Sequence, residues 1–298
     1  MVAQATNRGT SGVNLPTAVS TEIWQGFQET SAVASLTPNI PLPGAGVTVD
    51  IITGDPTAAW TAETEEKPVS DPTVASKVMR GYTLAVIEPF SNQFRRDKGA
   101  LYNALVGRLP GVLSARFDNT VFFGDAPGSD FDTLKNAPAV SINTNTYSGL
   151  LGAMGSVAAN GGDVSGWALS PTGELIALGS VDTLGRPIFI GNAALEGQVG
   201  SLLGRPVYKT KAVNKAGTAG TPGTPSTVGF AGDWTTAAWG QVQAIDISIS
   251  TEATINRGGT QINLWQRNMF AVRAEIEVGF RVRDVNKFAR LTGATPSA

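Results

Sequence analysis

Residues 270–282, with the sequence FAVRAEIEVGFRV, form the most regular pattern in the chain. The apolar residues of this segment share one parity: Phe270, Val272, Ala274, Ile276, Val278, Phe280 and Val282. The charged residues share the other: Arg273, Glu275, Glu277, Arg281 and, just beyond the segment, Arg283. Because successive side chains of a strand point to opposite faces, the pattern predicts a long β-strand with one buried and one charged face.

A helical pattern lies upstream of this strand, over residues 97–123. Its apolar residues recur with a period of about 3.6: Leu101, Leu105, Leu109, Val112, Leu113, Phe117 and Val121. Pro110 and Gly111 interrupt the pattern, and a proline inside an unbroken helix costs about 3 kcal/mol. We therefore predict the longest helix of the chain here, with a kink or short break at Pro110, and a stop at Gly124.

Strand-like alternation begins at Val47 and resumes at Val78, with acidic, turn-rich residues between them. The pattern predicts two strands joined by about 25 polar residues, as in a long projecting hairpin. Loops of that length inside a compact domain are uncommon and usually functional. The alternative, a flexible surface loop, is equally compatible with the composition.

The rest of the chain mixes short elements, which indicates an α+β fold. Residues 1–20 are small and polar, typical of an extended arm, and a short helix is predicted at 17–29. Between the arm and the closing strand we expect helices at 147–159 and 173–178, strands at 167–169, 188–190, 206–208 and 245–249, and a loop at 214–229.

The composition excludes much of enzyme chemistry. The 298 residues include neither histidine nor cysteine, which removes disulfides, cysteine-based metal sites and the commonest general base. We expect no metal, no cofactor and no catalytic turnover. Charged residues make up only 15% of the chain, against a typical share of about 25%, so an interaction protein is favoured. The net charge of −2 argues against a dedicated nucleic-acid binder.

Two further features bear on the location of the protein and on metal binding. The first ten residues have no apolar segment behind a basic start, and no stretch approaches about 18 apolar residues, so we predict a soluble protein made in a cytoplasm. Asp125, Asp130 and Asp132 lie close together in sequence but match no complete calcium loop. We interpret them as solvated turn residues.

Several motifs, in a consistent order, resemble the tailed-bacteriophage major capsid proteins of the Hong Kong 97 fold. Residues 66–71, EKPVSD, are similar to the Lys-Pro-x-Ser-Asp of that family's extended loop. Residues 124–128, GDAPG, resemble the turn after its spine helix. Residues 203–207, LGRPV, and 230–234, FAGDW, resemble two later elements. The resemblance covers roughly the whole chain.

The resemblance implies an arm with a short helix (1–30), an extended hairpin loop (45–90), a peripheral domain with the spine helix (91–140 and 251–290) and an axial domain (141–250). It implies pentamers and hexamers that form an icosahedral shell around double-stranded DNA. The implied partners are other copies of the chain, a separate scaffolding protein, a portal, a decoration protein and the packaged DNA. Assembly would take place in the host bacterial cytoplasm, and the product would be part of the virion.

The resemblance also implies one chemical step. In some family members a hairpin lysine forms an isopeptide bond with an asparagine of a neighbouring subunit, assisted by a glutamate. Lys67, Asn268 and Glu275 occupy those positions. Asn268 and Glu275 would lie some 23 Å apart on a straight strand, at about 3.3 Å per residue, so the three residues would come from different subunits. The alternative is that Lys67 is a solvated loop residue and the other two are polar residues of an interface strand.

Other functions stay open at this point. A cellular compartment of the encapsulin type has the same fold and holds a protein cargo. A β-rich carbohydrate-binding or adhesion module would use the scattered tryptophans. A carboxylate-dependent glycoside hydrolase would need two carboxylates about 5 to 9.5 Å apart across a cleft, and nothing in the sequence places such a pair.

Overall fold

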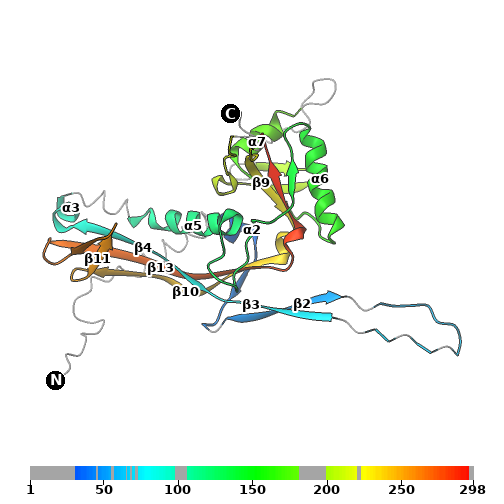
Figure 1. Ribbon diagram of the computed structural model, residues 1–298, viewed down its shortest axis with the longest axis horizontal. Coiled ribbons are helices and arrows are strands. Elements are labelled where there is room, and N and C mark those ends of the chain that lie inside the picture. Colours follow the sequence, from blue (N-terminus) through cyan, green and yellow to red (C-terminus); the bar gives the residue numbers. More distant parts are fainter. Residues whose placement is uncertain are drawn as a thin grey trace.

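The chain folds into an elongated molecule with two bodies and a projecting hairpin (Figure 1). One body is a long sheet covered by a helix, and the other is a smaller sheet with two helices. The computed structural model describes residues 31–44, 46–54, 57–64, 66–67, 69–70, 73–97, 106–180, 199–219 and 223–294. The predicted arm at 1–30 and the predicted strand at 188–190 lie outside the described residues.

The long sheet has four strands in the order β1 (Asn39–Pro41), β10 (Ala237–Ser250), β13 (Met269–Val282) and β4 (Tyr82–Ser91). β13 is antiparallel to both of its neighbours, and β1 is parallel to β10. The alternation predicted for β13 is confirmed, because its apolar parity is buried throughout from Phe270 to Val282.

Helix α5 (Leu109–Phe123) packs on the long sheet and supplies the other half of the main core. Leu113, Phe117 and Val121 are buried between the two. The break predicted near Pro110 is confirmed, because residues 107 and 108 form a turn and the helix starts at Leu109. Pro110 therefore lies in the first turn of α5, where its missing N–H would have no helical partner.

The smaller sheet has six strands: β5 (Ala139–Ser141), β14 (Phe288–Thr292), β9 (Thr227–Gly232), β6 (Gly166–Leu169), β8 (Arg205–Lys209) and β7 (Val199–Leu202), in that order. Helices α6 (Thr146–Ala159) and α7 (Pro171–Leu178) accompany it. The side chains of Asn145 and Ser170 cap them by accepting hydrogen bonds from backbone N–H groups of the first turns. A second apolar cluster fills this body.

The sheets divide the chain differently from the predicted domain ranges. β10 lies within 141–250 yet belongs to the long sheet, because its Ile245 and Ile247 are buried in the main core beside β13. β5 and β14, which straddle the predicted limits at 140 and 290, complete the smaller sheet. The chain passes from the long sheet to the smaller one between β4 and β5, by way of α5. It crosses again through the short 3-10 helices Trp234–Thr236 and Val285–Lys287.

The projecting hairpin consists of β2 (Val47–Gly54) and β3 (Thr73–Met79), paired antiparallel from Val47 opposite Met79. The predicted hairpin is thus present with different boundaries. Its second strand starts at Thr73 rather than Val78, and the following alternation, from Tyr82, belongs to β4 of the long sheet. Figure 1 shows the hairpin extending away from both bodies.

Three smaller elements complete the described structure. Helix α2 (Ala32–Leu36) precedes β1 and packs near α5. Helix α3 (Asn92–Asp97) follows β4, and β11 (Thr254–Arg257) pairs with β12 (Thr260–Asn263) between β10 and β13. No helix among the described residues is long and apolar enough to span a membrane.

Candidate assembly surfaces

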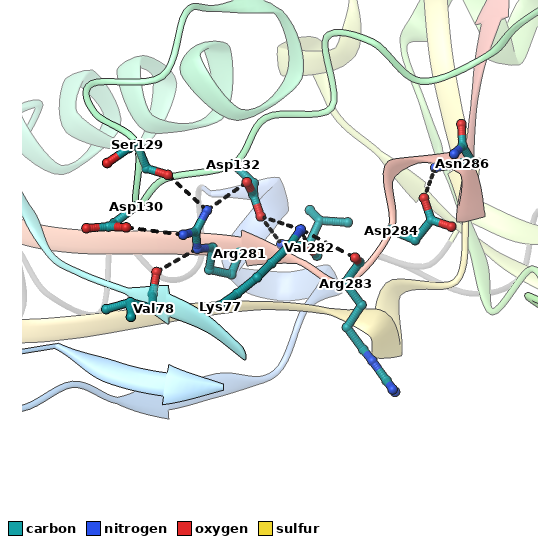
Figure 2. Close-up of polar contacts among 10 residues, drawn as sticks. All are labelled: Lys77, Val78, Ser129, Asp130, Asp132, Arg281, Val282, Arg283, Asp284 and Asn286. Carbon is teal, nitrogen blue, oxygen red and sulfur yellow. Dashed lines mark hydrogen bonds and ion pairs between the residues drawn. The ribbon is translucent and has the colours of Figure 1, made fainter. Parts of the chain in front are cut away.

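The root of the hairpin is fixed by Arg281 of β13. Its Nε donates to the carbonyl of Val78 in β3 at 2.7 Å, and its Nη1 donates to the carboxylate of Asp132 at 2.8 Å. Nη1 also reaches the carbonyl of Ser129, and Nη2 pairs with Asp130 at 3.4 Å. The Arg281 side chain is only 12% exposed. One guanidinium therefore joins the hairpin, the loop after α5 and the long sheet (Figure 2).

Lys77 adds a second connection at the same place. Its Nζ donates to the carbonyl of Val282 at 2.8 Å and pairs with Asp132 at 3.4 Å. Asp132 in turn accepts a hydrogen bond from the backbone N–H of Val282 at 3.1 Å. Figure 2 shows Asp132 between the two basic side chains. Because the partners come from three separate segments, the direction of the hairpin relative to the sheet is determined by these contacts.

The interpretation of the acidic turn was wrong for two of its three residues. Asp130 and Asp132 are about one quarter exposed and bind Arg281, so they are part of the root rather than solvated turn residues. Asp125 does lie in solvent, where a hydrogen bond and ion pair with Lys135 lower the pKa of its carboxyl. No group of three potential metal ligands occurs among the described residues.

Asp118 forms a separate attachment between α5 and the residues that follow the arm. Its carboxylate accepts hydrogen bonds from the Ser31 hydroxyl at 2.7 Å and from the backbone N–H groups of Ala32 and Val33 at 2.8 and 3.3 Å. These donors lie at the start of α2. Burial raises the pKa of Asp118 to about 6, although its three hydrogen bonds act in the opposite direction.

The structure keeps the three predicted crosslink residues apart within one chain. Lys67 is exposed in the loop that joins β2 to β3. Asn268 is exposed just before β13, has a φ of 52°, and accepts a hydrogen bond through Oδ1 from the Nδ2 of Asn92 at 2.9 Å. Glu275 lies within β13 and pairs with Arg273 at 3.4 Å. A reaction among them would therefore need more than one subunit.

Several large apolar side chains are exposed on the described surface. In the hairpin loop Trp60 is fully exposed and Val69 is 90% exposed. Ile87 of β4, Leu175 of α7 and Trp265 beside β13 are also at least half exposed. Apolar groups left in water at a projecting tip are typical of surfaces that another molecule covers.

Comparison with known protein families matches residues 11–293 to the phage capsid family. The chain belongs to this family. This capsid protein is 28% identical over 283 residues to the probable major capsid protein gp17 of Mycobacterium phage D29, covering 89% of this chain and 85% of that relative. The protein of the same name from Mycobacterium phage L5 is 28% identical over 285 residues, with the same coverage.

Solved structures share the fold of the capsid protein. A chain from Gordonia phage Cozz superposes with a TM-score of 0.72 at 22% identity, covering 90% of this chain and 87% of that one. A chain from Mycobacterium phage Adephagia gives 0.70 at 21% identity, with coverage of 90% and 91%. The capsid of a native GTA particle, computed with C5 symmetry, gives 0.64 at 13% identity, with coverage of 99% and 96%. The expected Hong Kong 97-like capsid fold is confirmed.

Sequence reasoning identified the family of the capsid protein but not its hairpin root. Arg281 was assigned only to the charged face of a strand, and its acidic partners lie about 150 residues away in sequence. One feature of the sequence could have indicated the root. Arg281 lies between Phe280 and Val282, which are buried, and a charged side chain so close to a core needs a hydrogen-bonding or ionic partner.

Proposed function

We propose that this phage capsid protein assembles with copies of itself into pentamers and hexamers, which close an icosahedral shell around double-stranded DNA. The observation that carries the proposal is the hairpin. Its root is held by partly buried ion pairs, while Trp60 and Val69 near its tip are exposed. A rigid projection with an apolar end is suited to contact a neighbour rather than its own body.

The first experiment is electron microscopy of the purified protein and measurement of nucleic acid in the particles. Closed shells with five- and sixfold capsomers that contain double-stranded DNA when isolated from lysates of infected cells are expected. Particles that hold protein cargo and no DNA would support a cellular compartment instead. A monomer that never assembles would contradict the proposal.

The proposal includes partners that act during assembly. We expect a separate scaffolding protein, a portal at one vertex and a decoration protein, with assembly in the host bacterial cytoplasm. DNA would be contained without sequence recognition, in keeping with the net charge of −2. Co-purification of immature particles, followed by mass spectrometry, would identify a scaffold if shells form only when a second phage protein is present.

A covalent isopeptide crosslink between subunits is a further part of the proposal. The Lys67 amine would attack the Asn268 side-chain carbon, an amide bond would form, and ammonia would leave, with Glu275 of another subunit accepting the amine proton. The exposure of Lys67 and Asn268 supports it, because both are accessible to a neighbour.

Denaturing gels of mature particles test this crosslink. Ladders are expected from the native chain, and Lys67→Arg particles should give one band near 30.9 kDa. Asn268→Asp, which has no ammonia to release, should also give one band. A single band from native particles would refute the crosslink and leave the shell proposal intact.

A further inference from the structure

Asn268 is held by hydrogen bonds on its backbone and on its side chain. Its N–H donates to the carbonyl of Trp265 at 3.2 Å, and its own carbonyl accepts from the backbone N–H of Asn92 at 3.1 Å. Its side-chain oxygen Oδ1 accepts from Nδ2 of Asn92 at 2.9 Å. The φ of Asn268 is 52°, in the left-handed region that asparagine adopts more readily than most residues. The side-chain amide of Asn268 is therefore positioned within its own chain.

Asn92 meets Asn268 because β4 ends where β13 begins. Ser91, the last residue of β4, pairs with Met269, the first residue of β13. The two strands are antiparallel, so the residue after Ser91 and the residue before Met269 lie opposite each other. The contact between the two asparagine side chains is exposed, so an amine from another subunit can approach it.

The two ends of the Asn268 amide differ in their contacts. Oδ1 is bound by Asn92, whereas Nδ2 of Asn268 has no hydrogen-bond partner in the part of the chain that the structure describes. When an amine adds to the carbonyl carbon of an amide, negative charge collects on the oxygen, and a donor already aimed at that oxygen stabilises the charge. The proposed crosslink releases the nitrogen as ammonia. The bound atom is thus the one that gains charge, and the free atom is the one that leaves.

We propose that Asn92 is a catalytic residue of the crosslink. Its Nδ2–H group donates to Oδ1 of Asn268 and stabilises the negative charge on this oxygen when Lys67 of another subunit attacks. This role rests on the proposed crosslink and adds a residue to it. Because Asn92 and Asn268 belong to the same chain, each subunit carries a prepared acceptor, and neighbouring chains supply the lysine and the carboxylate.

The electron and proton balance leaves Asn92 unchanged. The lone pair of the Lys67 amine forms the new C–N bond, and a pair from the C=O bond moves to Oδ1 of Asn268. Glu275 of another subunit accepts the amine proton and transfers it to the departing nitrogen. The old C–N bond then breaks, ammonia leaves, and the C=O bond re-forms. Asn92 neither takes nor gives a proton, and its hydrogen bond strengthens as the charge develops.

Crosslinking rates measured inside one mixed particle test this role. The first chain carries Lys67→Arg and a carboxy-terminal peptide tag, so it accepts crosslinks but cannot donate an amine. The second chain carries Asn92→Asp and no tag. In particles assembled from equal amounts of both, a dimer with one tag reports attack on an acceptor with native Asn92. A dimer without a tag reports attack on an acceptor with the substitution.

Tagged dimers should form about 100-fold faster than untagged dimers, as is typical when one donor to a developing oxyanion is lost. Aspartate has nearly the same shape as asparagine but offers an acceptor in place of the donor. Both dimers form in the same shells, so a defect in assembly affects them alike. Gln93→Glu in place of Asn92→Asp is the matched control, because it makes the same chemical change at the neighbouring exposed residue. It should give equal rates.

A second substitution and a second measurement separate lost charge stabilisation from a lost turn. Asn92→Ala keeps the backbone N–H that bonds to Asn268, and untagged dimers should then be about tenfold slower, because water can replace the donor. Hydrogen exchange at the N–H groups of Asn268 and Met269, which bond to Trp265 and Leu264, should match the native chain. Slower crosslinking accompanied by faster exchange at these groups would mean that Asn92 only holds the turn, which would overturn its catalytic role.

The failure of this role and the failure of the crosslink give different gels. Equal rates of tagged and untagged dimers would overturn the role of Asn92 and leave the crosslink standing. Native particles that form no ladder would refute the crosslink itself, and the role of Asn92 with it.

Discussion

Asp118 provides a quantitative test of how the chain after the arm is attached to α5. Its carboxylate is buried against Ser31, Ala32 and Val33, and its pKa is raised from 3.8 to about 6. Asp118→Asn removes the charge and keeps the shape. The amide has one carbonyl oxygen in place of two acceptors, so one backbone N–H of α2 would face an NH₂ group, at a cost of about 1–3 kcal/mol.

The sign of the pH effect follows from the raised pKa. The folded chain binds a proton more readily than the unfolded chain, so the cost of the buried charge is complete above about pH 6 and decreases as the pH falls toward 4. One pKa unit corresponds to 1.36 kcal/mol. Between pH 7 and pH 4, the stability of the native chain relative to Asp118→Asn should therefore rise by about 2 kcal/mol.

Urea unfolding of the unassembled chains, followed by tryptophan fluorescence at several pH values, measures this difference. Other carboxylates titrate in both chains and cancel in the comparison. Asp163→Asn, at a side chain that is 72% exposed, is the control and should change stability by less than about 0.5 kcal/mol. If the native and Asp118→Asn chains differ by a constant amount from pH 7 to pH 4, Asp118 is not held as a costly buried charge.

Further substitutions test the root, the close packing of the long sheet and the cost of a glycine within α6. Arg281→Met should destabilise the chain by about 2–3 kcal/mol and increase hydrogen exchange in β3, whereas Arg273→Met, at a half-exposed pair, should cost under about 1 kcal/mol. Gly279→Ala places a Cβ 2.5 Å from the backbone oxygen of Arg80 and should lower stability by about 1–3 kcal/mol in thermal unfolding. Gly155→Ala, in open space within α6, should instead raise it by about 0.5–1 kcal/mol.

The regular elements were predictable because the spacing of apolar residues along the sequence differs between strands and helices. Seven apolar side chains of one parity sufficed for β13, and all seven are buried. The apolar stripe of α5 and the position of Pro110 together predicted where the helix breaks. Local propensity and burial agree at these elements, so no distant information was needed.

The hairpin boundaries and domain ranges could not be obtained in the same way. β3 has Ser76 and Lys77 among apolar residues and no clean alternation. It belongs to a projecting hairpin and meets the long sheet at its end, where Met79 is buried. The range 141–250 groups β10 with the smaller body although β10 pairs with β13, because sequence order does not reveal which sheet a strand joins. The root was missed because its partners meet only after α5 and β13 have packed.

The separation between a fixed root and an exposed tip bears on how assembly would be controlled. Association costs conformational entropy, and a projection that is already oriented loses less of it on docking than a loose loop does. Arg281 and Lys77 provide that orientation from within one chain. Arg281→Met should therefore reduce particle formation even though Arg281, 12% exposed, is nearly inaccessible to a neighbour.

Sedimentation of Arg281→Met beside Trp60→Ala separates the contribution of the fixed root from that of the exposed tip. Both variants should assemble poorly, but only Arg281→Met should also show increased hydrogen exchange in β3 before assembly. Normal assembly of Arg281→Met with a loosened β3 would show that a fixed hairpin is not required.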